Sequence, residues 1–494
     1  MNEFLLGLHL VFNIETIMVV LAAAVFGIFV GAVPGLSATM AVALLVPITF
    51  YMDSIPAIAA IVTTSAMAIF AGDIPSTYLN IPGTPSSAAY VGDSYLLAKK
   101  GRSRETLGIN LVCSVFGGLF GTFILIFVAP SLAEVALQFS SFEYFWLALL
   151  GLSCSIFIAI GSRVKAFLSL MIGLLLSTVG LDMMSGTPRF IFGVPDLMGG
   201  INFIPVMIGM FALKELMLFY GSSGEGTQLP PLSKDSVVAN TPRHIKAYWP
   251  NMIRGSSIGT LIGALPGAGA DIAAWISYAV GKSRSKEKHL YGTGHIEGIV
   301  DASSANNSGI SGAWVPALVF GIPGDSITAI VIGVLYMKGM NPGPTIFMDG
   351  TGLIYALFIV FFVANLIMLP IGFIAIKFAK VFILTPRKIL MPIILCFCIV
   401  GAFSINSSVT DVWIMLLVGF VASILSRCNF PMAPAILGLV LGATLENNFM
   451  SSMLKADGDI FSFFSRPISA FLGVLVILLW LFPLLAMAYK KIKK

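Results

Sequence analysis

Charged residues are scarce in this sequence. Asp, Glu, Lys and Arg together make up 10% of its 494 residues, whereas 57% are hydrophobic and the mean hydropathy is +0.97. Soluble globular proteins carry about 25% charged residues, so the composition excludes that class. The sequence instead predicts a polytopic membrane protein.

The residue patterns of common enzymes and metal sites are also missing. The five cysteines show neither CxxC nor zinc-ligand spacing, which predicts buried free thiols. No GxSxG, HExxH or P-loop sequence occurs, and the four histidines fall in or near expected loops. For His295 and Glu297 we expect a solvated loop pair rather than an acid/base pair. An intramembrane enzyme is therefore disfavoured.

Basic residues concentrate in short stretches between apolar runs. They lie at 99–104, 162–165, 282–288, 377–388, 427 and 490–494. Lys and Arg in short loops hold those loops on the cytoplasmic side. We therefore attribute the net charge of +5 to residues that set the orientation in the membrane, and we predict no nucleic-acid binding. The first 15 residues lack the basic stretch of a cleavable signal peptide, so we expect the first membrane segments to direct insertion.

Two pairs of similar segments show that the chain is a duplication. GAVPGLSATM at 31–40 returns as GALPGAGADI at 263–272, and NIPG at 80–83 returns as GIPG at 321–324. Each copy thus holds two Pro-Gly helix breaks within apolar sequence. Breaks in hydrocarbon survive only where protein or a water-filled cavity satisfies the backbone, and duplicated breaks point to a transporter's binding site.

Apolar runs long enough to cross a membrane core of about 30 Å occur in two similar series. The first comprises 15–51, 57–92, 107–130, 143–161, 165–181 and 201–220. The second comprises 250–281, 305–338, 351–378, 389–403, 411–426 and 431–445, and a last run covers 467–489. The runs at 15–51 and 250–281 are too long for one crossing, so each is predicted to form a hairpin of two half-length helices.

Equivalent loops of the two copies differ in charge. The loop at 51–56 carries only Asp53, whereas its counterpart at 282–289 is basic, and the reverse holds for 99–104 and 338–349. Because basic loops face the cytoplasm, the copies are predicted to have opposite topology. We therefore predict an all-α fold of two inverted repeats with broken helices and re-entrant hairpins. The predicted parts are a first repeat at 1–220, a cytoplasmic linker at 221–249, a second repeat at 250–445, and a periplasmic loop, final helix and basic cytoplasmic tail at 446–494.

Each Pro-Gly break combines an unusual backbone with short polar side chains. Pro lacks a donor and Gly tolerates unusual dihedral angles, so a helix can begin in mid-membrane with free N–H groups that favour anions. A single Ser or Thr in a membrane helix more often serves packing, but clustering at four symmetric breaks favours binding. The predicted substrate-binding residues are Gly35, Ser37, Thr39, Asn80, Gly83, Thr84, Ser86, Ser87, Gly267, Gly269, Gly324, Ser326 and Thr328.

Oxygen-bearing side chains of the second copy suit a cation. Asp271 follows the third break, where an intramembrane acid is either a cation or proton site or a cap of its own helix. Hard cations prefer oxygen ligands, and the first copy carries uncharged Thr39 and Thr84 at the matching positions. The predicted ion-binding residues are Asp271, Asn306, Asn307 and Asp325, with Na+ as the expected coupling ion and a proton as the alternative.

Several motifs together resemble one known family. The broken segments, NIPGTP followed by YLLAKKG, SGTPRFIFG at 185–193, the ANN run, GIPG, NPGP at 341–344 and RPIS at 466–469 resemble the TctA large membrane subunit of tripartite tricarboxylate transporters. The resemblance covers nearly the whole chain. It implies a bacterial inner-membrane protein that works with a small four-helix membrane subunit and a periplasmic solute-binding protein. It also implies uptake of carboxylates with an ion gradient, commonly sodium.

Two stretches depart from the family pattern. The family often has Gly-Gly-Ser-Ile before its first NIPG, where this chain has AGDIPST at 71–77, and a glutamate before its ANN run, where this chain has Ser303 and Ser304. A stand-alone proton-coupled carrier or channel is the alternative to a binding-protein-dependent symporter. The sequence leaves open which carboxylate is carried and whether the chain forms a homo-oligomer.

Overall fold

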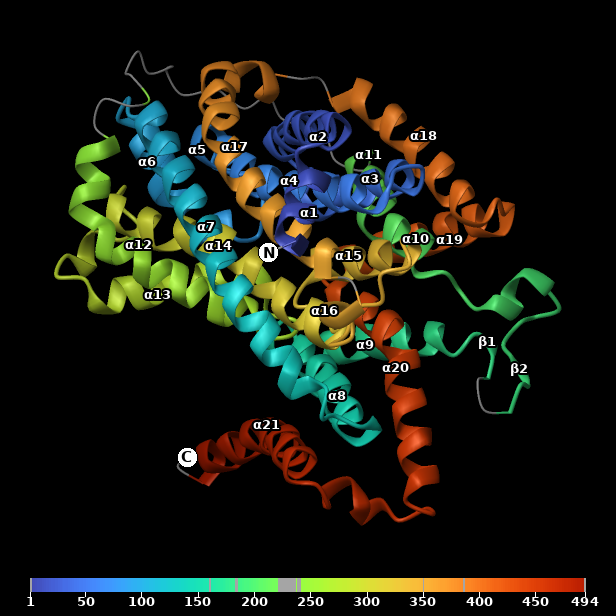
Figure 1. Cartoon of the computed structure of the whole chain (residues 1–494). Coiled ribbons are helices and arrows are strands. Elements are labelled where there is room, and N and C mark those ends of the chain that lie inside the picture. The colour runs from blue at the N-terminus through green and yellow to red at the C-terminus, as the bar shows by residue number, and fades with distance from the viewer. Residues whose placement is uncertain are drawn as a thin grey trace.

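Helices make up nearly all of the structure (Figure 1). The computed structural model describes residues 2–159, 161–182, 185–220, 237, 241–349, 351–384 and 387–492. Within these ranges the strands are β1 (Gly180–Leu181) and β2 (Pro188–Arg189), an antiparallel pair with Gly180 opposite Arg189. The predicted all-α membrane fold is therefore confirmed.

The helices of the first half follow the predicted apolar runs, and the run at 15–51 divides into two helices at its Pro-Gly break. Sequence analysis did not predict α1 or a separate α6, and a π-helical segment at Ile208–Leu213 joins α10 to α11. The helices are α1 (Asn2–Val11), α2 (Ile14–Ala32), α3 (Ala38–Phe50), α4 (Ser54–Ala71), α5 (Asp73–Leu79), α6 (Val91–Lys99), α7 (Ser103–Ala136), α8 (Ser141–Ile158), α9 (Arg163–Ser177), α10 (Phe203–Met207) and α11 (Lys214–Tyr220).

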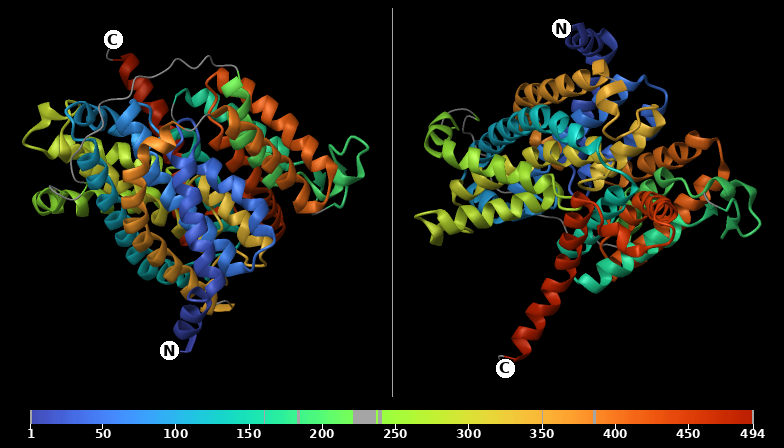
Figure 2. Two further views of the ribbon diagram at one scale, coloured as in Figure 1. Left: turned by 90° about the horizontal axis from the view of Figure 1, so that it is seen from above. Right: turned by 60° about the horizontal axis from the view of Figure 1, so that its bottom comes forward.

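The second half forms a further series of helices. Its helices are α12 (Thr241–Gly263), α13 (Gly269–Arg284), α14 (Ile296–Phe320), α15 (Ser326–Met337), α16 (Ile346–Asp349), α17 (Thr351–Ile383), α18 (Arg387–Asn406), α19 (Val409–Arg427), α20 (Ala433–Lys455) and α21 (Pro467–Ile492). Most of the predicted linker, residues 221–236 and 238–240, lies outside the described residues. Helix α20 continues through residue 445, where the second repeat was predicted to end. Helices α1 and α21 project from opposite sides of the helical body (Figure 2).

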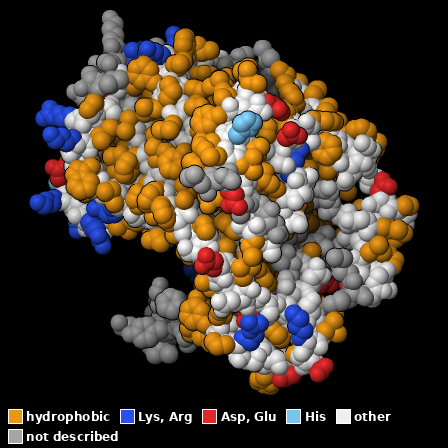
Figure 3. Space-filling model, in the orientation of Figure 1, with side chains coloured by type: hydrophobic (Ala, Val, Ile, Leu, Met, Phe, Trp, Pro, Cys, Tyr) orange, Lys and Arg blue, Asp and Glu red, His pale blue; other side chains and the backbone are white. Residues whose placement is uncertain are grey.

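The surface is as apolar as a membrane protein requires. By length and composition, five described spans could cross a membrane: Ile14–Ala32, Ser54–Leu79, Ser103–Ala136, Gly352–Ile383 and Val409–Arg427. Large apolar side chains such as Phe127, Trp413 and Phe420 are exposed. Figure 3 shows apolar side chains across much of one face, with Lys and Arg gathered at its left edge. Exposed apolar surface of this extent indicates contact with lipid.

Glycines bring α2 against α4 in the first half and α12 against α14 in the second. A Cβ at Gly31 would overlap the backbone of Ala68, and one at Gly263 would overlap the backbone of Gly309. One turn earlier, Gly27 meets Thr64 and Gly259 meets Ala305 in the same way. Small residues permit such close helix approach in membranes. The two halves are therefore built on matching helix pairs.

Loops that share a predicted side of the membrane lie together. The Lys338 ammonium donates to the carbonyls of Phe50 and Met52 at 2.9 and 2.5 Å, which joins two predicted periplasmic loops. The Lys100 ammonium donates to the Thr293 carbonyl at 3.3 Å, which joins two predicted cytoplasmic loops. These contacts agree with the inverted topology, which stays a prediction.

The glycine contacts can be tested by adding a methyl group. Gly31→Ala should destabilise the protein by about 1 to 3 kcal/mol, because the Cβ meets backbone that cannot move aside cheaply. Gly92→Ala is the matched control, since a Cβ there has open space within 4 Å. Thermal unfolding in detergent measures both. Equal melting temperatures for the two variants would contradict the close packing.

The inverted topology can be tested by labelling. Asp53→Cys and Lys286→Cys, each introduced into a variant without the five native cysteines, place single thiols at exposed equivalent loops. A membrane-impermeant maleimide added to intact spheroplasts should label position 53 but not position 286, which should react only after lysis. Labelling of both thiols from one side would contradict the inversion.

Candidate functional site

The four Pro-Gly breaks meet around one cavity of about 440 Å³. This volume lies within the range of small-molecule sites. Residues from all four breaks line it, although the breaks come from both halves of the chain. The predicted site residues that line the cavity are Ser37, Thr39, Thr84, Gly267, Asp271, Asp325 and Ser326.

The first break, between α2 and α3, presents a helix N-terminus to the cavity. Gly35 has φ of +86°, a conformation that favours glycine, and it turns the chain after Pro34. The Ser37 side chain caps α3 by accepting a hydrogen bond from the Met40 N–H at 3.1 Å. Ala38 and Thr39 in the first turn of α3 line the cavity. The positive end of the α3 dipole therefore faces the cavity.

The second break is held by its own hydroxyl groups. The Thr84 and Ser86 hydroxyls lie 2.9 Å apart, the Ser87 hydroxyl donates to the Thr84 carbonyl at 2.9 Å, and the Thr84 N–H donates back to the Ser87 oxygen at 3.2 Å. Thr84 lines the cavity, whereas Ser86 and Ser87 are buried behind it. Asn80 is exposed with φ of +56° and ends α5, so the structure does not bring it to the cavity.

The third and fourth breaks pack against each other. Gly267 and Gly269 have φ of +82° and +58°, and a Cβ at Gly269 would overlap the side chain of Asp325. Asp325 caps α15 by accepting the Thr328 N–H at 2.8 Å, while the Thr328 hydroxyl accepts the Asp325 N–H at 2.8 Å. Thr328 is buried and serves this capping box. Gly324 packs against Ala313 and does not line the cavity.

Backbone donors from neighbouring breaks reach the cavity acids. The Asp271 carboxylate lies near the backbone N–H of Ser86, and the Asp325 carboxylate lies near that of Ala270. The Trp275 indole N–H also donates to the Pro85 carbonyl at 3.2 Å. The N-cap of α13 is Ala268, so Asp271 does not occupy the capping position of its own helix. Asp271 was predicted to be either a cation or proton site or a cap of its own helix. In the structure it is not the cap, and it faces the cavity.

The two predicted asparagine ligands lie elsewhere. Asn306 and Asn307 are buried inside α14 and do not line the cavity. The Asn306 amide donates to the Tyr90 hydroxyl at 3.5 Å, and the Asn307 amide lies 3.4 Å from the Met368 sulfur. The structure therefore divides the predicted ion-binding set into a cavity pair, Asp271 and Asp325, and a buried pair.

The cavity also contains a basic residue that was not among the predicted site residues. Lys214 lines it from α11, next to Glu215, and the two side chains form an ion pair of 2.8 Å. The preceding segment, Ile208–Leu213, is π-helical, and such bulges often occur at functional sites. The signal was present, because an ionisable residue inside the apolar run at 201–220 indicates function.

The charges of the cavity lining suit an anion only when cations accompany it. Three acids, Asp271, Asp325 and Glu215, and one base, Lys214, belong to the lining. After Lys214 and Glu215 pair, two carboxylates have no basic partner in that lining. Among the described residues, no group of three or more His, Cys, Asp or Glu could hold a metal ion.

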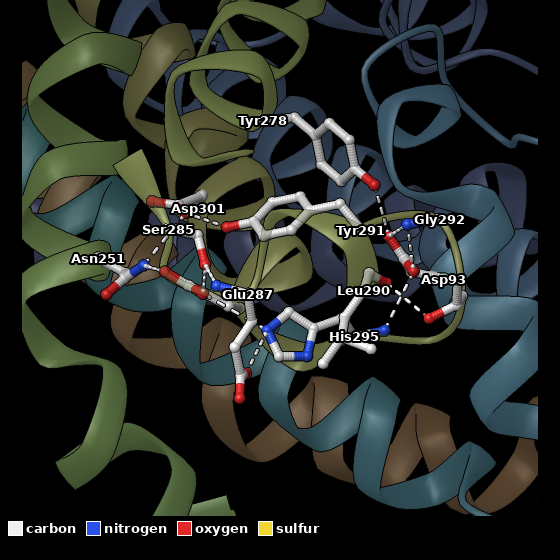
Figure 4. A network of polar contacts seen from close by, with 12 residues as sticks. Asp93, Asn251, Tyr278, Ser285, Glu287, Leu290, Tyr291, Gly292, His295 and Asp301 are labelled. Carbon is white, nitrogen blue, oxygen red and sulfur yellow. Dashed lines mark hydrogen bonds and ion pairs between the residues drawn. The ribbon is translucent and has the colours of Figure 1, made fainter. Parts of the chain in front are cut away.

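A second polar cluster joins the two halves on the predicted cytoplasmic side (Figure 4). The Asp93 carboxylate in α6 accepts the backbone N–H groups of Gly292, Gly294 and His295 at 3.0, 2.7 and 3.0 Å. It also accepts the Tyr278 hydroxyl at 2.6 Å. One carboxylate of the first half thus holds the loop between α13 and α14 of the second.

His295 and Glu297 belong to this cluster, so the expectation of a solvated pair is wrong. His295 Nε2 lies 3.4 Å from a carboxylate oxygen of both Glu287 and Glu297, and Glu297 also accepts the Ser285 hydroxyl at 2.6 Å. The side chains of His295 and Glu297 are only 12% and 14% exposed, and Asp93 of α6 holds the loop that carries His295. Burial, with Asp301 and Glu297 nearby, raises the pKa of Tyr291 well above its ordinary value. Its hydroxyl therefore stays a donor at neutral pH.

Comparisons with known proteins identify relatives. The model of the tripartite tricarboxylate transporter TctA family matches residues 17–437. An Agrobacterium vitis protein, "Uncharacterized 52.8 kDa protein in TAR-I ttuC' 3'region", is 33% identical over 444 residues, which cover 90% of this chain and 88% of that protein. A second A. vitis protein, "Uncharacterized protein in TAR-II ttuC' 3'region", is 32% identical over 228 residues, which cover 46% of this chain and 94% of that protein. No solved structure matches the chain.

The Asp93 contacts can be tested by an isosteric change. Asp93→Asn should lower the stability by about 1 to 3 kcal/mol, because buried backbone N–H groups lose a charged acceptor. The control is Asp53→Asn, whose exposed carboxylate makes no capping hydrogen bond. Thermal unfolding of both variants in detergent is the measurement. An unchanged melting temperature for Asp93→Asn would contradict the role of Asp93 in joining the halves.

Proposed function

The chain belongs to the tripartite tricarboxylate transporter TctA family, and we propose that it imports a carboxylate by sodium symport through the cavity between its four breaks. TctA is a transporter family and not an enzyme family. Its members are membrane subunits of tripartite transporters. The observation that carries the proposal is the meeting of four broken helices at one cavity that contains a lysine.

The cavity offers a carboxylate both charge and hydrogen-bond donors. The Lys214 ammonium is paired with Glu215. A substrate carboxylate that enters the cavity would replace Glu215 as its partner. The N-terminus of α3 adds the positive end of a helix dipole, and the Thr39 and Ser326 hydroxyls add donors. Half-helix N-termini that face an anionic substrate are typical of secondary transporters with broken helices.

The cavity acids give a reason for cation coupling. A carboxylate that enters beside Asp271 and Asp325 meets two negative charges at short range, and like charges in a site of low dielectric repel strongly. A sodium ion bound by these oxygen atoms would remove the repulsion, so anion and cation would favour each other's binding. This thermodynamic linkage is what symport requires.

We further propose the partners and the location of the family for this chain. The partners are a small membrane subunit and a periplasmic solute-binding protein, and the location is the bacterial inner membrane. Selection of the carboxylate would then rest largely on the binding protein. A stand-alone carrier is the second candidate, because the cavity lies within a single chain.

Lys214 provides the direct test of the cavity. The complete transporter is reconstituted in proteoliposomes, and uptake of radiolabelled citrate, malate and succinate is measured with inward sodium or potassium gradients. Lys214→Met should raise the half-saturating carboxylate concentration about 10- to 100-fold, since a hydrogen bond to a charged group contributes about 1.5 to 3 kcal/mol. Lys214→Arg keeps the charge and should lose less.

The control is Lys286→Met, which removes an exposed lysine of the basic loop and should leave uptake unchanged. Parent-like affinity in Lys214→Met would refute the cavity as the substrate site. Uptake without the binding protein would favour the stand-alone carrier. Uptake that follows a proton gradient and ignores sodium would refute sodium coupling.

A further inference from the structure

Asp73 is a buried acid without a basic partner. Its side chain is fully buried at the start of α5, and it forms none of the ion pairs found among the described residues. One oxygen, Oδ1, accepts the Tyr90 hydroxyl at 2.5 Å. The other, Oδ2, has no hydrogen-bond partner in the described part of the chain. A buried carboxylate in this state is costly unless a cation or proton neutralises it.

Two further buried oxygens near Asp73 also lack partners. Asn306 contacts the same Tyr90 hydroxyl through its amide nitrogen, and its Oδ1 is unpartnered among the described residues. Thr77 lies four residues after Asp73 and therefore on the same face of α5, and its Oγ1 is likewise unpartnered. All three side chains are fully buried. The cluster thus combines one charge with neutral oxygens from two different halves of the chain.

We propose that Asp73, Thr77 and Asn306 form a sodium site, separate from the cavity acids, that couples cation binding to the substrate cavity. Sodium is a hard cation that prefers oxygen ligands, and one carboxylate with neutral oxygens provides the single negative charge that a monovalent ion needs. Tyr90 positions the carboxylate through Oδ1. This inference rests on the proposed symport, but the binding of the ion can be measured without a carboxylate substrate.

The second half of the chain carries no acid at the equivalent position. The contact of Gly83 with Gly72 matches that of Gly324 with Ala313, so the residues after these partners, Asp73 and Trp314, occupy equivalent positions. Trp314 is fully buried and packs edge-on against Phe361, with ring centroids 5.0 Å apart. A large apolar ring therefore fills the place where the first half carries the acid.

A direct path leads from Asp73 to the cavity. Gly72, the preceding residue, accepts hydrogen bonds from the Ser76 hydroxyl at 2.8 Å and from the Gly83 N–H at 3.3 Å. A Cβ at Gly72 would lie 2.8 Å from the Thr84 methyl group, and Thr84 lines the cavity. An ion that fixes α5 through Asp73 and Thr77 would thus also fix the loop that carries Thr84. Ion and substrate would then stabilise the same arrangement, which is the physical content of coupling.

The test measures sodium binding to the full-length chain in carboxylate-free detergent solution. Radioactive ²²Na⁺ binding and the melting temperature in sodium against potassium are the two readouts. The parent should bind the ion and be stabilised by it. Asp73→Asn should weaken binding at least about tenfold, because it removes the charged ligand. It should also melt higher than the parent in potassium, since it removes an unpaired buried charge, and this result shows that the variant folds.

Three more variants sharpen the result. Asn306→Ala should weaken sodium binding without changing the charge. Asp411 is another buried acid, which lies far from Asp73 in the chain and accepts a hydrogen bond from Asn406. Asp411→Asn should therefore bind sodium like the parent. Asp271→Asn removes a proposed ligand of the cavity cation, and the sodium binding that depends on Asp73 should persist in this variant.

Unaltered sodium binding in Asp73→Asn would overturn the proposal, as would a parent whose melting temperature follows pH and ignores sodium. Loss of all sodium binding in Asp271→Asn, with parent-like binding in Asp73→Asn, would place the ion in the cavity and also overturn it. Sodium binding that depends on Asp73 in a protein that transports no carboxylate would refute the proposed function and leave the sodium site intact.

Discussion

The structure depends on one constraint: backbone polar groups inside an apolar body must find partners. Each of the four breaks leaves a helix end with free N–H or carbonyl groups. Side chains of the breaks satisfy some of them, as Ser37 does for α3 and Asp325 for α15. Neighbouring elements supply others, as when the Trp275 indole N–H of α13 donates to the Pro85 carbonyl of the second break. Because the breaks satisfy one another, they gather in one place, and the cavity is the space that they enclose.

Close glycine contacts fix where the breaks lie. Gly31 against Ala68, and Gly263 against Gly309, hold the helix before each first break tightly on its neighbour. These two helix pairs are thus packed in the same way in both halves, whereas the side chains of the breaks differ. Thr84 in the first half corresponds in sequence to Asp325 in the second, and Asp73 corresponds to Trp314. A duplicated scaffold with unequal side chains lets one half hold an ion while the other provides packing.

Charged residues are few, and the partner of each buried ionisable group can be examined in turn. Lys214 and Glu215 pair beside the cavity, Asp301 pairs with Arg254, and Asp93 is enclosed by backbone donors. Against this background of satisfied groups, Asp73 stands out because one of its oxygens has no partner among the described residues. The other buried ionisable groups named here have partners, whereas Asp73 Oδ2 has none in the described part of the chain, and this difference indicates the site.

The class of protein, the helical runs, the four breaks and the family could all be predicted, because they follow from local composition, from local motifs and from Pro and Gly, whose effects are local. The sequence also placed Ser37, Thr39, Thr84 and Asp271 correctly at breaks. Which polar groups share a space could not be predicted in this way. The packed helices separate Asn306 from Asp271, bring Asn306 to Tyr90, and add Lys214 to the cavity. The reason is that the direction of a side chain around a helix axis gains meaning only when the neighbouring helix is known, and that neighbour is fixed by contacts between residues far apart in the chain.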